Sequence, residues 1–467
     1  MKKVITITLI VLGSSFLNYC QGQYIDIHNF NGVTGEAPYG SLVLSGSKLF
    51  GMTSVGGTGN YGVVFSVDTN GNNYKNILNF NGTNGKNPHG SLTLSGSKLF
   101  GMTSAGGTSN LGLVFSIDTN GNNYKDILNF NGTNGLTPKG SLLLYRNKLY
   151  GMVSGGGILD SGTVFSLDTN GSNYKDIFNF NYTHGYAPFG SLIYASGILY
   201  GMTSAGGTSN YGVVFSVDTN GNNYKDILNF NGTLNGKAPQ GSLIRSGAKL
   251  FGMVSENGPG AFGLAFAIDT NGSNYKDLLD FNGTNKGGTP YGDLILSGNN
   301  LFGMASRGGT SGYGVAFSID TDGSNYMDIL NFNGTNGEAP YGSLILSGNV
   351  LFGMVSQHGP GGYGVVFGIR DSAIKIDNSI NELVSNSGVI SIYPSPSNGT
   401  FTLSLSKINE KCIVEIYNVL GENIYRTALS SNNTKINLSG QPKGIYFYRV
   451  LEKEGNIVGS GKVLIEK

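Results

Sequence analysis

The chain of 467 residues contains no tryptophan, two cysteines and four histidines. Two cysteines cannot supply a covalent framework, so the fold must close through packing and hydrogen bonds. The few histidines are not at metal-ligand spacing from one another and predict no metal site. Charged residues make up 12% of the chain and the formal net charge is +1. This balance excludes a general attraction to nucleic acid or to an anionic membrane.

Glycine, in contrast, is abundant at 76 residues, and it recurs at fixed places. Fixed places indicate turns and close contacts rather than a disordered tract. A Gly-Met pair marks each repeat, with spacings of 50, 50, 50, 51, 51 and 50 residues. This period is about the length of one propeller blade. The pairs begin at Gly51, Gly101, Gly151, Gly201, Gly252, Gly303 and Gly353.

One repeat, residues 90–131, contains four stretches that are typical of β-strands. They are 91–95, 98–104, 112–118 and 124–131, and the Asn120-Gly121 pair between the last two is a strong tight-turn signal. The repeats hold no sustained 3.6-residue period, so essentially no helix is expected there. Phe115 and Phe130 recur in the other units and are expected to fill the space between stacked sheets.

The two ends of the repeat array complement each other. Residues 24–31 match the fourth strand of a repeat, whereas the last repeat stops at Ile369 after its third strand. If the N-terminal strand completes the last sheet, a ring closes and no exposed edge remains. We therefore predict an all-β chain whose repeats form a seven-bladed β-propeller over residues 23–370.

These units also resemble a known bacterial repeat family. The Leu99-Phe100-Gly101-Met102 step and the Gly106-Gly107 loop that leads to Val114-Phe115 are similar to the tandem repeat named after Gloeobacter and Verrucomicrobia. The resemblance covers roughly residues 24–369, and the family's usual Tyr-Gly-Thr step is Phe-Gly-Met or Tyr-Gly-Met here. It implies the repeat architecture and no particular chemistry.

The N-terminus has the pattern of a secretory signal peptide, which we place at 1–22. Lys2 and Lys3 precede the apolar run 4–12, which is too short to span a membrane. Cys20 follows the bulky Tyr19, which argues against lipidation. Cleavage near residue 22 would leave Cys412 as the only thiol and no transmembrane segment.

The period ends after Ile369, and residues 371–387 are interpreted as a linker. Residues 388–467 alternate in strand-like stretches with Pro and Gly turns, which predicts a small β-sandwich. They resemble the C-terminal sorting domain of type IX secretion cargo (the Por secretion tail). The matching pieces are the Tyr-Pro-x-Pro-x-Asn-Gly start at 393–399, the turn at 418–421, the strand at 444–448 and the end at 461–467. The resemblance implies the type IX machinery as partner and a secreted or outer-surface attached protein that passes through the periplasm.

No constellation of catalytic residues is visible, and neither a cofactor nor a metal is predicted. Asp118 and its equivalents open an Asp-Thr-Asn-Gly turn whose oxygens could hold calcium, but the glycine is misplaced and no bidentate Glu follows. Asx and Asn-Gly turn chemistry accounts for these residues better. The Gly-Gly loops lack a helix N-terminus for binding phosphate, and the repeated Ser residues lack a His partner.

Differences between the repeats therefore carry the functional prediction. The residue before each Gly-Ser or Gly-Asp step varies, and so do the loops between the second and third strands. In a propeller these positions surround one mouth of the central channel, where ligands commonly bind, although drift of solvated loops would also produce variation. The candidate ligand-binding residues are Tyr39, His89, Lys139, Phe189, Gln240, Tyr291, Tyr341, Arg307 and His358.

Three functions remain open from the sequence. The preferred hypothesis is a secreted or surface-displayed binding or adhesion protein with an extracellular glycan or protein as its ligand. The second is an extracellular polysaccharide or peptide hydrolase or lyase with one asymmetric site around Asp160, Glu256 or Glu338. The third is a structural component of the cell surface.

Overall fold

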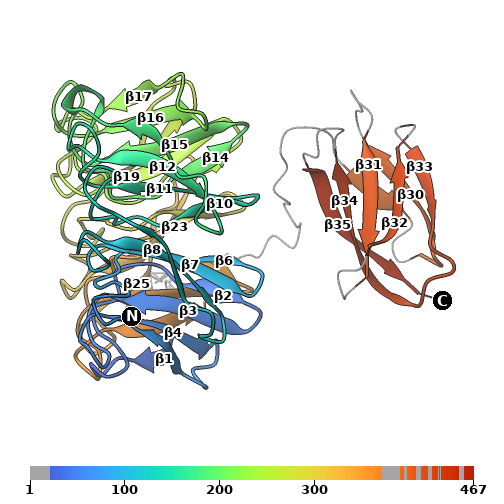
Figure 1. Ribbon diagram of the computed structural model, residues 1–467, viewed down its shortest axis with the longest axis horizontal. Coiled ribbons are helices and arrows are strands. Elements are labelled where there is room, and N and C mark those ends of the chain that lie inside the picture. Colours follow the sequence, from blue (N-terminus) through green and yellow to red (C-terminus); the bar gives the residue numbers. More distant parts are fainter. Residues whose placement is uncertain are drawn as a thin grey trace, which may run out of the picture. The chain divides into compact units, whose positions relative to one another are not determined.

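The computed structural model describes residues 22–370, 390–393, 397–405, 412–418, 423–429, 431, 433–451 and 457–466. Of the signal peptide predicted at 1–22, residues 1–21 lie outside the described residues, as does the linker predicted at 371–387. The chain divides into two compact units, one containing the repeats and one containing the tail (Figure 1).

The repeats form seven antiparallel sheets of four strands each, which we call blades. The first strands are β2 (Val43–Ser45), β6 (Thr93–Ser95), β10 (Leu143–Tyr145), β14 (Ile193–Ala195), β18 (Ile244–Ser246), β22 (Ile295–Ser297) and β26 (Ile345–Ser347). The second strands are β3 (Lys48–Thr53), β7 (Lys98–Thr103), β11 (Lys148–Val153), β15 (Ile198–Thr203), β19 (Lys249–Val254), β23 (Asn300–Ala305) and β27 (Val350–Val355). The third strands are β4 (Val63–Asp68), β8 (Leu113–Asp118), β12 (Thr163–Asp168), β16 (Val213–Asp218), β20 (Leu264–Asp269), β24 (Val315–Asp320) and β28 (Val365–Arg370). The fourth strands are β5 (Lys75–Asn79), β9 (Lys125–Asn129), β13 (Lys175–Asn179), β17 (Lys225–Asn229), β21 (Lys276–Asp280), β25 (Met327–Asn331) and, for the last blade, β1 (Gln23–Asn29).

The predicted closure of the ring is confirmed. Strand β1 pairs with β28, from Gln23 opposite Arg370 to Asn29 opposite Val365, and Figure 1 shows this blue strand beside the orange end of the repeats. Ile27 and Phe30 are buried in a core shared with the first blade. Burial of side chains of this size stabilises a fold by about 1.5–3 kcal/mol each. The N-terminal strand therefore holds the ring shut without a covalent link.

The Gly-Met pair is explained by packing within each blade. In β7, a Cβ on Gly101 would lie 2.6 Å from Cζ of Phe115 on β8. Glycine at this place lets the fully buried ring of Phe115 lie across the neighbouring strand. The phenylalanines also join blades as predicted, because Phe115 meets Phe80 of the preceding blade and Phe130 meets Phe165 of the following one, each pair edge to face at 5.5 Å.

One local expectation was inaccurate. The first strand of each repeat is shorter than predicted: β6 begins at Thr93, because the amide of Ser91 is used in a contact with the next blade. One short 3₁₀ helix, η1 (Tyr182–His184), replaces a turn in the loop before the fourth blade.

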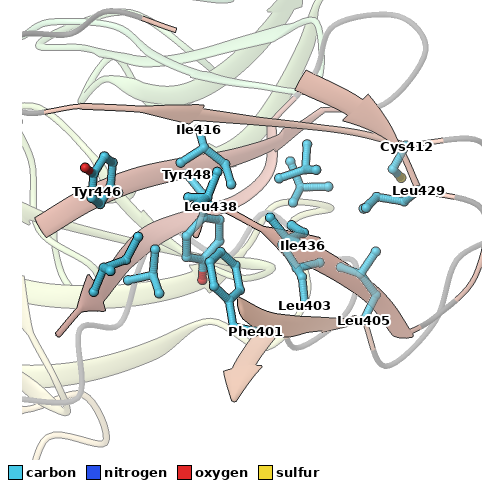
Figure 2. Packing of buried hydrophobic residues seen from close by; sticks show 14 residues of the cluster. Phe401, Leu403, Leu405, Cys412, Ile416, Leu429, Ile436, Leu438, Tyr446 and Tyr448 are labelled. Carbon is cyan, nitrogen blue, oxygen red and sulfur yellow. The ribbon is translucent and has the colours of Figure 1, made fainter. Parts of the chain in front are cut away.

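The second unit contains two packed sheets, as predicted for a small β-sandwich. One consists of β29 (Ile390–Tyr393), β30 (Thr400–Leu405) and β33 (Asn433–Asn437). The other consists of β32 (Asn423–Ala428), β31 (Ile413–Tyr417), β34 (Gly444–Leu451) and β35 (Ile457–Ile465). Figure 2 shows side chains of both sheets, including Phe401 and Ile416, meeting in the core, with Cys412 and Leu429 together at one end.

Candidate ligand-binding face

Each loop type belongs to one of two faces of the propeller. The loops from the fourth strand of one blade to the first strand of the next pair with the loops between second and third strands, as in the bridge of Lys86 to Ala105. The remaining turns meet each other instead: the amide of Thr119 donates to the carbonyl of Ser97 at 2.8 Å. We call the first set the variable face and the second the turn face. The variable face contains residues 30–42 and 54–62 and their equivalents; the turn face contains 46–47 and 69–74 and their equivalents.

A closed ring of hydrogen bonds surrounds the axis just below the variable face. We call the glycine of each Gly-Ser or Gly-Asp step the axial glycine. In every blade, the backbone amide of the residue after the axial glycine donates to a side-chain oxygen of the next blade. The donor and acceptor residues are Ser41 to Ser91 (2.7 Å), Ser91 to Ser141 (2.7 Å), Ser141 to Ser191 (2.8 Å), Ser191 to Ser242 (2.8 Å), Ser242 to Asp293 (2.5 Å), Asp293 to Ser343 (2.6 Å) and Ser343 to Ser41 (2.7 Å). The last bond returns to the first blade, so the ring has seven members.

The axial glycines allow this ring to be narrow. A Cβ on Gly140 would lie 2.1 Å from the carbonyl oxygen of Gly190, and a Cβ on Gly342 would lie 2.2 Å from that of Gly40. These neighbours are backbone atoms and cannot rotate away as a flexible side chain could. The repeated Gly-Ser step is therefore a device for closing the ring.

The structure brings together seven of the nine predicted ligand-binding residues. Together with the Gly-Ser ring they line one hollow of about 70 Å³. The seven are Tyr39, His89, Lys139, Phe189, Gln240, Tyr291 and Tyr341. This volume holds about two water molecules, whereas pockets for small ligands usually measure about 300–1,000 Å³. The mouth is thus a nearly filled platform and not a deep pocket.

Contacts between the mouth residues explain why so little space is left. Tyr39 stacks on His89 at 5.0 Å and meets Tyr341 edge-on at 5.2 Å, and Tyr341 lies 4.9 Å from Tyr291. On the other side of the mouth, Nζ of Lys139 lies 4.4 Å from the centre of the ring of Phe189. Four aromatic rings therefore form a continuous half-buried arc on one side of the mouth.

Burial changes the pKa values at this mouth. It lowers the pKa of His89 to about 4, helped by the ammonium group of Lys139, so the imidazole is neutral at physiological pH. Burial also lowers the pKa of Lys139 and raises those of Tyr39 and Tyr291. The charges of Arg307 and Glu256 act on the pKa of Tyr291 in opposite directions, Arg307 lowering it and Glu256 raising it.

Arg307 and His358 lie in the loops of the variable face between second and third strands and are not among the residues that line the hollow. Arg307 is exposed. Nδ1 of His358 is in close contact with Oε2 of Glu338, within the same pair of loops. Seven of the predicted residues thus form the mouth and two lie outside it on the same face.

The carboxylates considered for catalysis are each engaged in their own loops. Glu256 forms an ion pair with Lys237 at 2.9 Å, and Glu338 contacts His358. Asp160 accepts the amide of Gly156 at 3.1 Å, as Asn60 does from Gly56 in the first blade.

The repeated Asp-Thr-Asn-Gly turns also have protein partners. Asp118 forms an ion pair with Lys98 at 3.0 Å and accepts from the amide nitrogen of Asn123 at 2.6 Å. These contacts lower the pKa of Asp118. Both carboxylate oxygens are occupied within the turn, which agrees with its interpretation as turn chemistry. Within the described ranges, no group of three or more His, Cys, Asp or Glu side chains is arranged to hold a metal ion.

Sequence reasoning missed a second feature of the variable face, its exposed apolar side chains. In the described part of the propeller, every large apolar residue that is strongly exposed lies in a loop of this face, and Ile158 at 80% and Val33 at 69% are the most exposed. The others are Tyr61, Leu159, Tyr182, Leu234, Phe262 and Tyr363. Aligning the repeats loop by loop would have revealed Ile158, which stands where other repeats have Thr or Pro, and Leu159, which stands where they have Ser or Gly.

At one boundary between blades, the large residue and the glycine that usually pack together on this face are exchanged. Elsewhere an aromatic residue or Leu of one loop lies over a glycine of the next, as Phe262 does over Gly283. At the boundary of the third and fourth blades, Ser161 replaces the large residue and Tyr182 replaces the glycine. Tyr182 is 66% exposed and contacts Tyr186 at 4.7 Å.

A larger hollow of about 590 Å³, which no sequence pattern predicted, lies on the turn face between the fifth and sixth blades. Its lysines already have partners: Lys249 pairs with Asp269 at 3.2 Å, and Lys276 donates to the carbonyl of Asp322 at 2.6 Å. Its polar groups are largely satisfied by the blades that form it.

Comparisons with known families confirm both predicted resemblances. Residues 14–211 and 148–367 match the family described as Gloeobacter/Verrucomicrobia repeat, and residues 391–466 match the secretion system C-terminal sorting domain. The type IX sorting domain indicates a secreted or outer-surface attached protein. No helix in the described residues is both long and apolar enough to cross a membrane.

Individual proteins are matched over limited parts or at low identity. An endo-acting ulvan lyase of Formosa agariphila is 31% identical over 86 residues, which is 18% of this chain and 16% of that protein. The chain therefore spans much less than two thirds of this curated relative. Among solved structures, PorZ, a surface component of the type IX secretion system of Porphyromonas gingivalis, has 15% identity and a TM-score of 0.46 over 94% of this chain and 61% of that one. A Niastella koreensis GH74 enzyme has 11% identity and a TM-score of 0.49, and the match covers 95% of this chain and 74% of that one.

Proposed function

The chain belongs to the Gloeobacter/Verrucomicrobia repeat family, and we propose that it is a secreted or surface-attached protein that binds an extracellular polymer with its variable face. The observation that carries this proposal is the one-sided distribution of exposed apolar side chains in the propeller. Exposed apolar groups that gather on one surface of a folded protein commonly mark a binding site.

The shape of the mouth favours a polymer over a small molecule. A hollow of about 70 Å³ cannot enclose a small ligand, whereas the arc from Tyr291 through Tyr341 to Tyr39 offers a surface on which an extended chain can lie. The exposed apolar side chains of the same face, such as those of Val33, Ile158 and Leu234, come from loops of several blades. Binding therefore involves many shallow contacts spread over the face.

Binding is also better supported than hydrolysis. Hydrolysis of glycosides ordinarily needs two carboxyl groups facing one bond at about 5–9.5 Å. Asp160, Glu256 and Glu338 come from three different pairs of loops, and each is held by a partner in its own pair. We propose no catalytic residue.

The test uses the full chain on an array of extracellular polysaccharides and proteins. We expect the triple variant Y39A/Y291A/Y341A to lose at least tenfold in affinity for whichever polymer the unmodified chain retains. The matched control is K249A/K276A, which alters the larger hollow on the turn face. Retention that survives the triple variant but not the control would assign binding to the turn face. Absence of retention by any polymer would favour a purely structural surface component.

A further inference from the structure

Aromatic side chains recur at one place in the loops between second and third strands of the variable face. The place is the residue before the last glycine of each loop, and Leu111 and Ser161 are its exceptions. The other five repeats have Tyr61, Tyr211, Phe262, Tyr313 and Tyr363 there. We call these five residues and Tyr182 the loop aromatics. All six lie outside the hollow at the mouth.

The third repeat breaks this pattern, and the loop that follows it restores an aromatic ring at the same boundary. Ser161 is buried, and its carbonyl accepts the amide of Ala187 at 3.2 Å, which joins the two loops. Tyr182 in the second loop stands where the six other repeats have glycine. Its side chain is 66% exposed, so packing between blades does not account for it. The ring of Tyr182 is therefore free to contact a ligand.

The other loop aromatics rest on backbone and keep part of their surface exposed. A Cβ on Gly283 would lie 2.6 Å from Cζ of Phe262, and a Cβ on Gly232 would lie 2.9 Å from Cε2 of Tyr211. Exposure is 38% for Tyr61, 43% for Phe262 and 39% for Tyr363. A ring that is supported in this way is a rigid, flat platform, and a ligand that stacks on it orders few further torsions.

The side chains next to these platforms carry opposite charges at equivalent positions. The amide of Asn87 donates to the carbonyl of Tyr61 at 3.0 Å, and that of Ala37 donates to the carbonyl of Tyr363 at 3.2 Å. The residue before this amide is charged in four repeats, where it is Glu36, Lys86, Lys237 or Glu338. Nζ of Lys86 lies 6.0 Å from the ring centre of Tyr61. The sign of the charge thus changes from one platform to another.

Over the whole variable face the formal charges cancel. The five cations are Lys86, Lys139, Lys237, Lys286 and Arg307, and the five carboxylates are Glu36, Asp160, Glu256, Asp293 and Glu338. A polymer with charges of one sign would be attracted at some platforms and repelled at others. Ammonium groups donate hydrogen bonds and carboxylates accept them, whereas a hydroxyl group can do both. Neutral sugars therefore suit the platforms of either sign.

We infer that the polymer is a neutral polysaccharide, whose sugar rings stack on the loop aromatics while its hydroxyl groups bond to the Lys and Glu side chains beside them. This inference rests on the proposed function, and it adds the chemical class of the polymer and a second set of contacts outside the mouth. Aromatic faces suit the apolar faces of sugar rings.

The spacing of the loop aromatics favours a polysaccharide over a protein. Binding energy in protein interfaces is concentrated in a central cluster of residues. The loop aromatics instead belong to six different blade boundaries. A chain of repeated sugars can occupy several equivalent platforms, and each further contact of the same chain raises its avidity.

Affinity electrophoresis of the full chain compares neutral polymers with charged derivatives of the same backbone. Hydroxyethyl cellulose is compared with carboxymethyl cellulose, and dextran with dextran sulfate and diethylaminoethyl dextran. Galactomannan, arabinoxylan and laminarin extend the neutral set to other sugars. We expect a neutral polymer to retain the chain at least as strongly as any charged derivative does. Its retention should change less than twofold between low and high salt, since screening acts on contacts between charges.

The test variant is Y182A/F262A, which removes two loop aromatics. The control is Y393A/F447A, which removes two rings of 52% and 48% exposure from the second unit. We expect at least tenfold weaker retention by the neutral polymer for the test variant and a change below twofold for the control. Y182F/F262Y keeps both rings and should behave like the unmodified chain. Unfolding curves check each variant, and if Y182A/F262A does not fold, Y182A alone should weaken retention about threefold.

Three results would overturn the inference. Stronger retention by a charged derivative, lost at high salt, would show that the ligand is selected by charge. Retention by a protein on the array, without any neutral polysaccharide, would assign a different class of ligand. Unchanged retention of the folded test variant would remove the loop aromatics from the site. In each case the proposed function stands if Y39A/Y291A/Y341A abolishes binding, whereas both proposals fail if no polymer retains the chain.

Discussion

The two faces of the propeller use their polar residues in opposite ways. On the turn face, four blades repeat the same ion pair between the second and third strands, as in Lys48 to Asp68 at 2.9 Å and Lys148 to Asp168 at 3.0 Å. On the variable face, Lys237 and Glu256 form a pair that the other blades do not repeat. Side chains are alike where they contact their own blade, and they differ where they face solvent. This difference is the reason for proposing that the variable face carries the function.

The largest effect should come from the axial ring of hydrogen bonds below the variable face. In Gly140→Ala, the new Cβ would lie 2.1 Å from the carbonyl oxygen of Gly190. We expect the free energy of unfolding to fall by about 3 kcal/mol, because overpacking against rigid backbone cannot be relieved locally. Denaturant unfolding curves measure this change in the free energy of unfolding. The control is Gly96→Ala, whose Cβ meets no atom within 4 Å, so that only its positive φ of 58° opposes it. Equal losses in both variants would contradict the close approach of blades.

Acid should destabilise the propeller through two histidines. Burial lowers the pKa of His28 and of His89 to about 4. Because the folded-state pKa lies below the usual 6.5, each neutral imidazole supports folding fully above pH 6.5, and this support is lost as pH falls toward 4. We expect a loss of about 2 kcal/mol for each histidine over this window.

Unfolding curves at several pH values between 7 and 4 would measure this effect. H28Q and H89Q serve as comparison variants, since neither can be protonated in this range. Each should flatten the pH dependence, with H28Q testing the closing strand and H89Q testing the mouth. An unchanged slope in both variants would show that other groups control acid unfolding.

One residue breaks the symmetry of the axial ring and should reduce stability. Asp293 stands where the other six blades have Ser, and burial raises the pKa of its carboxyl. A raised pKa in the folded state means that ionisation opposes folding above the usual pKa near 4. We expect Asp293→Ser to raise the free energy of unfolding by about 1 kcal/mol at pH 7, and this gain should shrink as pH falls toward 4. A loss of stability at pH 7 would indicate that the carboxylate is needed to hold the ring.

The smallest effect is expected at the repeated ion pairs of the turn face. Lys98→Met breaks the contact with Asp118, but the side chain of Lys98 is 38% exposed. Exposed ion pairs contribute little to stability, and salt screens them. The thermal midpoint should change less than in any variant above, and the change should vanish in 1 M salt. A large change that persists in salt would show that this pair is part of the core of the turn.

Much of the fold could be predicted from the sequence because the same pattern of strands and turns recurs in seven repeats. The period, the Asn120-Gly121 turn and the displaced strand at residues 24–31 together indicated a closed ring. The volume of the mouth could not be predicted in this way. The volume depends on side-chain contacts between neighbouring blades, such as the edge-on packing of Tyr39 against Tyr341. The alternation of residues along a strand does not predict such contacts.

Part of the site could be predicted because the repeats can be compared position by position. The seven variable residues before the Gly-Ser or Gly-Asp step do meet at one mouth. The sequence marks Ile158 as different, because the other repeats have Thr or Pro at its place, but only the structure shows that its side chain is exposed. The contacts of Glu256 and Glu338 were also unpredictable, since their partners come from neighbouring loops and not from the same strand.

The most direct test is hydrogen–deuterium exchange of the full chain with and without the polymer that it retains on the array. We expect slower exchange in the variable face, at residues 131–141, 284–292 and 305–314. Turn-face residues such as 118–123 and 321–326 should exchange at unchanged rates. Slower exchange confined to the turn face, or bound polymer without any change on the variable face, would contradict the account.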